Sequence, residues 1–223
     1  MRRAAALLAG AAAALAAGTA PAASTPRECH GLQVCVPVVG PWVAVPATPV
    51  QYLLSCPRGY IVGGTDAELS DRAIDVVFLG SLGAPVNPGV TTSRDALFVG
   101  TYVGTGGSAP TFRPHVGCIP SAGGGGRVPV AAYVFPPGQP AARHARNVTV
   151  GLGIWRVAAG CATGERLVSG WHAIAFQTKA PPASDLVHGV SATQALRSGR
   201  VVVTVSAAAR AVVQVGAFCS GGR

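Results

Sequence analysis

Residues 50–67 read VQYLLSCPRGYIVGGTDA, and residues 152–173 read LGIWRVAAGCATGERLVSGWHA. In each stretch an apolar run leads into a cysteine, a Cys-x-x-Gly turn follows, and a second apolar run comes after the turn. Later in the chain each stretch is matched by a run that ends on a cysteine, at Cys118 and at Cys219. Repetition of this order predicts two copies of one β-module.

Strand alternation predicts how the six cysteines pair. Residues two apart in a strand share a face, and the four cysteines that end these runs all fall on the more apolar side of their strands. An even number of cysteines in a secreted chain is typical of a disulfide framework, although spacing alone allows 15 pairings. The inward-facing sides favour Cys56–Cys118 and Cys161–Cys219, with a local Cys29–Cys35 bridge.

The rest of the sequence is also strand-like, because β-branched and aromatic runs are bounded by Gly, Pro, Asn or Ser. The best helix candidate, residues 67–73, is one or two turns long. We therefore predict an all-β fold of two tandem antiparallel sandwich-like modules. The further predicted strands are 74–79, 96–103, 127–135, 147–155, 172–176 and 200–207, and the predicted units are module 1 (24–118), a glycine-rich linker (119–127) and module 2 (128–223).

Residues 1–23 have the features of a secretory signal peptide. Two arginines precede an apolar run at residues 4–17, and small residues suit cleavage near Ala20 to Ala23. The run is shorter than the roughly 20 residues that span a bilayer, and no later segment reads as a transmembrane helix. The sequence predicts a secreted or extracytoplasmic protein.

Three short stretches, CPRGYIVGG (56–64), CATGERLVSG (161–170) and VVQVGAFC (212–219), resemble a recurring pattern in secreted proteins of GC-rich bacteria. That pattern has a Cys-Pro-x-Gly…Gly-Gly opening and a final Val-x-Val-x-Ala-x-Cys strand. The resemblance covers most of the chain after the signal peptide, and it implies secretion and β-structure with no particular activity. Module 2 departs from the pattern at Ala162, in place of proline, and at Ser169, in place of the first glycine.

The string IVGG at residues 61–64 is similar to the start of the mature chain of trypsin-like proteases. Neither the GDSGGP string around that family's nucleophilic serine nor the TAAHC string around its base histidine occurs. We therefore reject a protease. Gly63 and Gly64 are interpreted as permitting a β-bulge or a close approach of another backbone.

No motif for catalysis or for a cofactor stands out, because the sequence contains no nucleophile elbow, His-Glu-x-x-His motif or phosphate-binding loop at a strand–helix junction. The cysteines lack Cys-x-x-Cys spacing, and the five histidines have no metal-ligand spacing. Carboxylates cluster only at Asp66, Glu68, Asp71 and Asp75, which suits a solvated loop better than a calcium site. We expect no metal, no cofactor and no enzymatic activity.

Charge is the one functional hint. Residues 24–118 carry five arginines against six acidic residues, whereas residues 119–223 carry ten basic residues against two acidic ones. Such asymmetry favours attraction to anionic polymers, and the densest basic spot predicts contacts from Arg143, His144 and Arg146 to a cell-envelope polymer. No aromatic stacking platform accompanies the basic residues, so specific nucleic-acid binding is not expected.

Two alternatives to a non-enzymatic envelope-binding protein stay open. A secreted glycan hydrolase needs two acidic residues across a cleft, which only Asp66 to Asp75 with Asp95 could supply. A secreted inhibitor needs a rigid exposed loop, for which VNPGVTTS (86–93) is the candidate. Convergent carboxylates in a pocket would favour the hydrolase, and a flat basic face on module 2 would favour the envelope-binding protein. The sequence does not determine the ligand or the oligomeric state.

Overall fold

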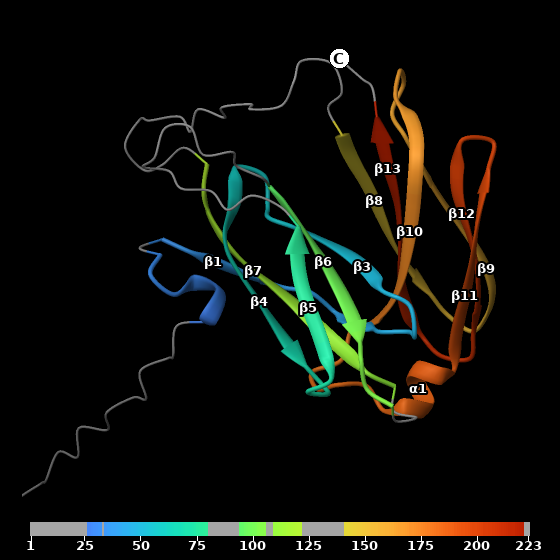
Figure 1. Cartoon of the computed structure of the whole chain (residues 1–223), viewed down its shortest axis with the longest axis horizontal. Helices are drawn as coiled ribbons and strands as arrows, with labels where there is room; N and C mark the ends of the chain where they lie inside the picture. The colour runs from blue at the N-terminus through green and yellow to red at the C-terminus, as the bar shows by residue number, and fades with distance from the viewer. Residues whose placement is uncertain (1–25, 33, 80–93, 106–108, 122–140, 221–223) are drawn as a thin grey trace, which may run out of the picture.

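The computed structural model describes residues 26–32, 34–79, 94–105, 109–121 and 141–220 (Figure 1). These residues confirm the predicted all-β fold. The first half contains the 3-10 helix η1 (Arg27–Cys29) and strands β1 (Val36–Val39), β2 (Trp42–Ala44), β3 (Val50–Ser55), β4 (Tyr60–Leu69), β5 (Ile74–Leu79), β6 (Asp95–Tyr102) and β7 (Thr111–Pro120). The second half contains β8 (Ala141–Val150), β9 (Gly153–Gly160), β10 (Arg166–Phe176), helix α1 (Ser184–His188), β11 (Val190–Arg197), β12 (Arg200–Ala207) and β13 (Ala211–Ser220).

The strands in the described ranges form three antiparallel sheets. The seven-stranded central sheet has the order β1-β7-β2-β10-β13-β8, with β4 pairing to the other side of β7. The remaining described strands form two three-stranded sheets, β3-β6-β5 and β11-β12-β9. Strand β2 joins the halves, because Val43 lies opposite Phe112 of β7 and also opposite Ala175 of β10. Strands from both predicted modules therefore belong to one sheet.

The two halves have matching strand pairings. In each half, the cysteine that begins the Cys-x-x-Gly turn directly follows an edge strand of a small sheet, which is β3 in the first half and β9 in the second. The glycine that ends the turn has a positive φ in both. In each, the next strand carries a register shift opposite the closing cysteine, between Val62 and Gly64 in β4 and between Leu167 and Ser169 in β10. The order β3-β6-β5 in the first half corresponds to β9-β12-β11 in the second.

The disulfides lie inside these halves. The bonds are Cys56–Cys118, Cys161–Cys219 and Cys29–Cys35, which confirms the two pairs predicted from inward-facing cysteines and the predicted local bridge. Cys56 and Cys118 are buried in the core of the first half, and Cys219 is buried in that of the second. The two long-range bonds thus tie the edge of a small sheet to the central sheet through a packed interior.

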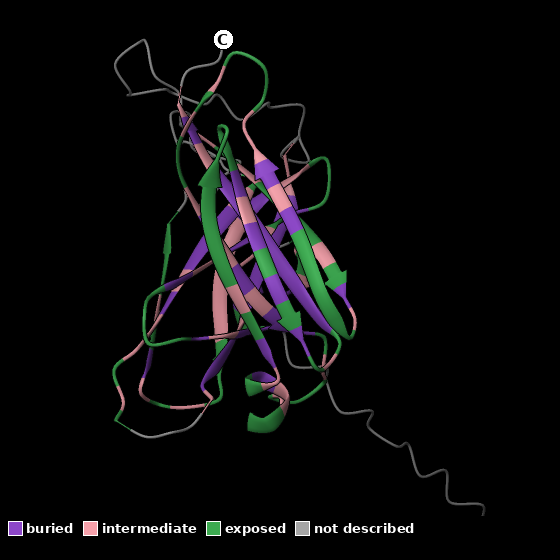
Figure 2. Ribbon diagram, turned by 90° about the vertical axis from the view of Figure 1, so that its right-hand side faces the viewer, coloured by how far each residue is buried: buried purple, intermediate pink, exposed green. Residues whose placement is uncertain are grey.

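Each half has its own hydrophobic core. Tyr52 and Phe98 of the β3-β6-β5 sheet pack against Phe112 of β7 in the first core. Burial raises the pKa of Tyr52 to about 12, although a hydrogen bond with Asn147 lowers it in part. In the second core, alternate residues of β12 and β13 face one another, as Figure 2 illustrates by the alternating burial along the front sheet. Ala173 and Val212 of the second half extend the first core across the boundary.

A buried glutamine connects the halves. Gln214 of β13 is 1% exposed, and its side-chain amide makes four hydrogen bonds. Oε1 accepts from the backbone N–H of Leu53 at 2.7 Å and from Nε1 of Trp171 at 3.3 Å. Nε2 donates to the backbone oxygen of Leu53 and to Oδ1 of Asn147, both at 2.9 Å. The amide therefore pairs with the backbone of strand β3 as a neighbouring strand would.

Three expectations about local structure were wrong or lie outside the described residues. Residues 67–69 belong to β4 and pair with β7, so strand pairing overrides the helical expectation for 67–73. The predicted strand 147–155 is two strands, because the chain turns at Gly151–Gly153, where Gly153 has a φ of 113°. The predicted strand 127–135, most of the linker and the loop 86–93 fall outside the described residues, and Ile119 and Pro120 of the linker belong to β7.

The glycines of the IVGG string have structural roles. Gly63 occupies the bulge in β4 opposite Cys118. A Cβ on Gly64 would lie 2.0 Å from the backbone oxygen of Glu28, and one on Gly117 would lie 2.1 Å from the same atom. Gly64 and Gly117, which are paired across β4 and β7, therefore allow η1 to rest directly on the central sheet. The bulge at Gly63 and this contact confirm the interpretation of the IVGG glycines as a bulge and a close backbone approach.

Replacing Gly64 by alanine is expected to lower the free energy of unfolding by about 1–3 kcal/mol, because a backbone atom of η1 must move to relieve the overlap. Denaturant unfolding followed by circular dichroism measures the change. Gly151→Ala is the matched control, since a Cβ there meets no atom within 4 Å. Equal stability of the two variants would mean that η1 does not rest on Gly64 in solution.

Candidate anion-binding surface

The basic residues predicted to bind an anion lie on β8, an edge strand of the central sheet. Arg143 and Arg146 are three residues apart in this strand and therefore point to opposite faces. The Arg143 guanidinium lies 5.7 Å from the centroid of the Phe218 ring. His144 lies 2.6 Å from Glu165, measured from Nε2 to Oε2. The structure thus does not bring Arg143, His144 and Arg146 together on one surface.

A different basic surface lies on the outer face of the β11-β12-β9 sheet, away from the second core. Alternation places Arg156 of β9, Arg200 of β12 and Arg197 of β11 on this face, and all three are exposed. We call it the arginine face. None of the three strands contains an acidic residue. The face therefore has positive charge with no carboxylate of its own sheet to neutralise it.

A shallow hollow of about 230 Å³ opens on the arginine face. Arg156 and Arg197 line it from the two outer strands, and Val202 lines it from the middle strand. Thr193 and Thr204, which lie opposite each other, add hydroxyl groups. Guanidinium groups and hydroxyls around one hollow are donors that suit a sulfate, phosphate or carboxylate group.

Two of the arginines are held directly opposite each other. Arg197 and Arg200 flank a two-residue hairpin loop in which both Ser198 and Gly199 have positive φ. Like charges opposite one another in a sheet are destabilising. The aliphatic part of Arg200 lies over Gly160, whose Cβ position is 3.5 Å from Cγ of Arg200. An anion bound near this pair would relieve its repulsion.

The structure brings two of the clustered carboxylates, Asp66 and Glu68, to one hollow and places the other acidic candidates elsewhere. In the described residues, Asp75 lies on β5, Asp95 on β6 and Asp71 in the turn before β5, and none of the three lines the hollow that contains Asp66 and Glu68. Asp66 faces this hollow, which measures about 900 Å³ and lies over β4 and β7. That hollow also contains Glu68 of the predicted carboxylate cluster, together with Glu28 and His115, which the sequence did not single out. Convergent carboxylates are the feature expected of the hydrolase alternative, and here Glu28 and Glu68 pair with His115 and Arg113.

His115 lies between two carboxylates in this hollow. Its Nδ1 is 3.5 Å from Oε1 of the buried Glu28, and its Nε2 is 3.5 Å from Oε1 of Glu68. Arg113 pairs with Glu68 at 3.8 Å and lies 5.9 Å from the Trp42 ring centroid. Because Glu28 belongs to η1, the arrangement helps to attach the N-terminal disulfide loop to the sheet.

One group of potential metal ligands occurs in the described residues. The ligand atoms of His144, Glu165 and Cys219 lie within 4.8 Å of one another. Cys219 is bonded to Cys161, however, so its sulfur is not a thiolate ligand. The pKa of Glu165 is lowered, chiefly by a hydrogen bond from the Ala162 backbone N–H and secondarily by His144. These contacts stabilise the Cys161–Gly164 turn.

Comparisons of the chain with protein family models, with curated protein sequences and with solved structures found no match. None of the described helices is long and apolar enough to cross a membrane. The three disulfides fit an oxidising, extracellular environment.

Sequence reasoning missed the arginine face because its residues are far apart in the chain. Arg156 is separated from Arg197 and Arg200 by β10 and α1. The available signal was alternation, since Arg197 and Arg200 flank Ser-Gly between two strand-like runs. The clustering of basic residues in the sequence points instead to residues 143–146. Neighbouring residues in a strand point to opposite faces, so this cluster does not form one surface.

Proposed function

We propose that this is a secreted, non-enzymatic protein of two related β-modules that binds anionic cell-envelope polymers through the arginine face. The signal peptide at residues 1–23 lies outside the described residues and remains part of the proposal. Three disulfides and the excess of positive charge after residue 118 support it. The matching pairings around the two Cys-x-x-Gly turns support the origin of the halves as copies of one module.

The observation that carries the proposal is the exposed outer face of β11-β12-β9, with three arginines and no acidic residue in its strands. Gly160, which lies opposite Arg200, is four positions after Arg156 in β9, so the charged rows are about 13 Å apart along the strands. A polymer with repeated anionic groups can contact both rows at once. Two such contacts raise the overall affinity by the effective-concentration argument.

The double variant Arg156→Glu with Arg197→Glu is expected to bind purified cell envelope at least about tenfold more weakly at low salt, because it removes charge-assisted hydrogen bonds and introduces repulsion. Co-sedimentation of the oxidised protein measures the bound fraction. High salt should release the wild-type protein as well, since exposed charges are screened.

The matched control is Arg166→Glu with Arg210→Glu, which makes the same change in net charge at exposed residues outside the arginine face. It should retain most of the binding. A further variant, Arg143→Ala with Arg146→Ala, tests the contacts that the sequence suggested on β8. Equal loss in the face variant and the control would mean that net charge alone drives binding, and absence of pelleting at low salt would exclude the proposal.

A further inference from the structure

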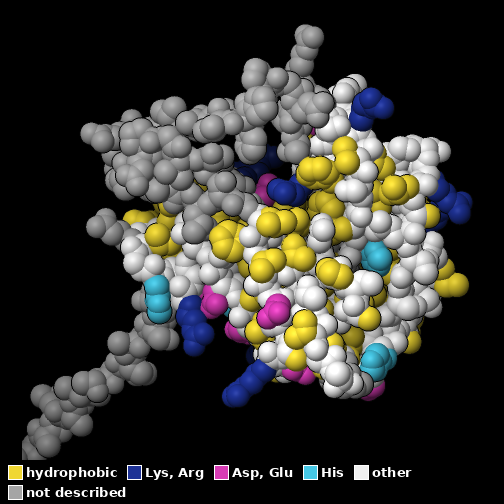
Figure 3. All heavy atoms as spheres, in the orientation of Figure 1, with side chains coloured by type: hydrophobic (Ala, Val, Ile, Leu, Met, Phe, Trp, Pro, Cys, Tyr) yellow, Lys and Arg dark blue, Asp and Glu magenta, His cyan; other side chains and the backbone are white. Residues whose placement is uncertain are grey.

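A second concave region, unrelated to the arginine face, lies between the two halves of the molecule. Strand β2 pairs only with the last two residues of β10, Ala175 and Phe176. The preceding part of β10 therefore has an open edge toward the first half. Hydrophobic side chains gather in the middle of this side of the molecule in Figure 3. A groove of about 650 Å³ opens beside β10.

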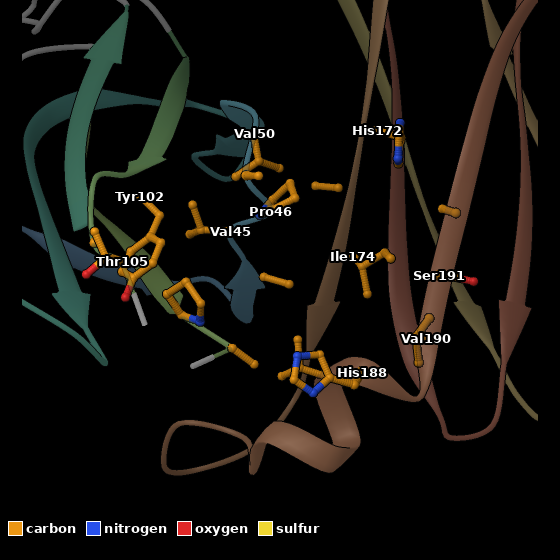
Figure 4. Close-up of a pocket in the computed structure, with 18 residues that line it drawn as sticks. Val45, Pro46, Val50, Tyr102, Thr105, His172, Ile174, His188, Val190 and Ser191 are labelled. Atoms are coloured by element: carbon orange, nitrogen blue, oxygen red, sulfur yellow. The ribbon is translucent and has the colours of Figure 1, made fainter. Parts of the chain in front are cut away.

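The lining of this groove comes from both halves (Figure 4). Val45, Pro46 and Val50 of the β2–β3 segment lie across from His172 and Ile174 of β10, with α1 and the start of β11 at one end. Its apolar lining includes Val45, Val50, Ala173, Ile174, Val187 and Val190. Its size is within the range of about 300–1,000 Å³ that is typical of small-molecule sites, which often lie at such boundaries.

The described lining residues include no Asp, Glu, Lys or Arg. A charged ligand would therefore lose its hydration without gaining an ion pair from these residues. Apolar area and the lack of formal charge together favour a neutral ligand. This property separates the groove from the arginine face, which has the opposite chemistry.

The hydrogen bonds around His172, a polar residue that lines the groove, define which of its ring nitrogens is an acceptor. The Nε2 of Gln194 donates to the backbone oxygen of Gly170 at 3.0 Å, so the other amide atom, Oε1, faces His172. An oxygen at 3.0 Å from Nδ1 of His172 requires a proton on Nδ1. In the neutral imidazole the remaining nitrogen, Nε2, is then an acceptor, and it has no hydrogen-bond partner among the described residues. Gln194 thus orients the imidazole of His172, which is one of the residues that line the groove.

We propose that this groove binds a small, neutral and largely apolar molecule whose hydroxyl or N–H group donates a hydrogen bond to Nε2 of His172. The apolar body of the ligand packs between the β2–β3 segment and β10. Because both halves line the groove, a bound molecule also braces one half against the other. The ligand class follows from the lining and does not depend on anion binding at the arginine face.

The test uses 4-hexylphenol as a neutral apolar probe with one donor, and its methyl ether, 4-hexylanisole, as a probe of similar shape without the donor. Calorimetric titration of the oxidised protein at pH 8 measures the two affinities. The wild-type protein should bind the phenol about five- to tenfold more tightly than the ether, since one net hydrogen bond has that effect. His172→Phe should bind both probes equally.

Pro46→Arg should weaken both probes by at least about tenfold, because it introduces a charged chain into the groove from an exposed position. Pro181→Arg, at an exposed proline away from the groove, is the control and should bind as the wild type does. The proposal is overturned if neither probe binds, if the phenol has no advantage over the ether in the wild type, or if Pro46→Arg binds as well as Pro181→Arg.

Discussion

Replacement of Gln214 by methionine is expected to lower the free energy of unfolding by about 3–5 kcal/mol. The side chain of Gln214 is the hydrogen-bond partner of the Leu53 N–H and C=O and of the Trp171 N–H. Methionine fills a similar volume but pairs with none of them, and each buried polar group left without a partner costs about 1–3 kcal/mol. Urea unfolding monitored by tryptophan fluorescence measures the loss.

Gln194→Met is the matched control for this change. Gln194 also bonds to a backbone oxygen and to a ring nitrogen, but it is exposed, so water replaces its hydrogen bonds. Its loss should stay below about 1 kcal/mol. Similar small losses in both variants would show that water reaches Leu53 between the two halves and that the glutamine does not hold them together.

Removal of the Cys56–Cys118 disulfide by a double change to alanine is expected to destabilise the protein by about 4 kcal/mol. The bond closes a loop of 62 residues, and the chain-entropy relation assigns about that value to such a loop. Both cysteines are buried in the first core, so alanine also leaves unfilled space there. Denaturant unfolding without reductant gives the comparison with the wild type.

Removal of the Cys29–Cys35 disulfide by the same double change to alanine is the internal reference for this measurement. That bond closes a loop with a separation of only 6 residues. The same relation gives about 2 kcal/mol for that loop. Loss of the long-range bond should therefore be clearly the more damaging. Equal effects would contradict an origin in loop closure and would place the stabilisation in local contacts of the cysteines.

Local pattern predicted the parts of the fold that depend on residues near each other in sequence. Alternation put Cys56, Cys118, Cys161 and Cys219 on inward faces, and β12 occupies the predicted residues 200–207. It also put Gln214 on the opposite face of β13 from Cys219. Alternation could not show that this second face is covered by β3 of the other half. Burial of Gln214 is a property of the packing between halves, and nothing in its own strand encodes the partner.

The sequence predicted a basic surface in the second half of the chain but did not predict which residues form it. Charge asymmetry pointed to the second half, where the arginine face lies. The density of basic residues pointed to β8, where a three-residue spacing separates Arg143 from Arg146 across the sheet. The groove beside β10 had no sequence signal, because it depends on β2 being only three residues long. A groove of this kind forms where the pairing between two strands stops, and the pattern of residues in the sequence does not show where that pairing stops.

The two side chains that join the halves, Trp171 and Gln214, have charged counterparts in the first half. Trp171 lies ten residues after its turn cysteine and Gln214 five residues before its closing cysteine, and both meet β3 of the first half. The positions at the same distances in the first half hold Asp66 and Arg113, on a face that η1 partly covers. A further unit would meet charged side chains there instead of the indole and amide that the existing contact uses. The two halves therefore differ in what they offer a neighbour: the second half presents an indole and an amide to β3, and the first half presents a carboxylate and a guanidinium at the corresponding positions.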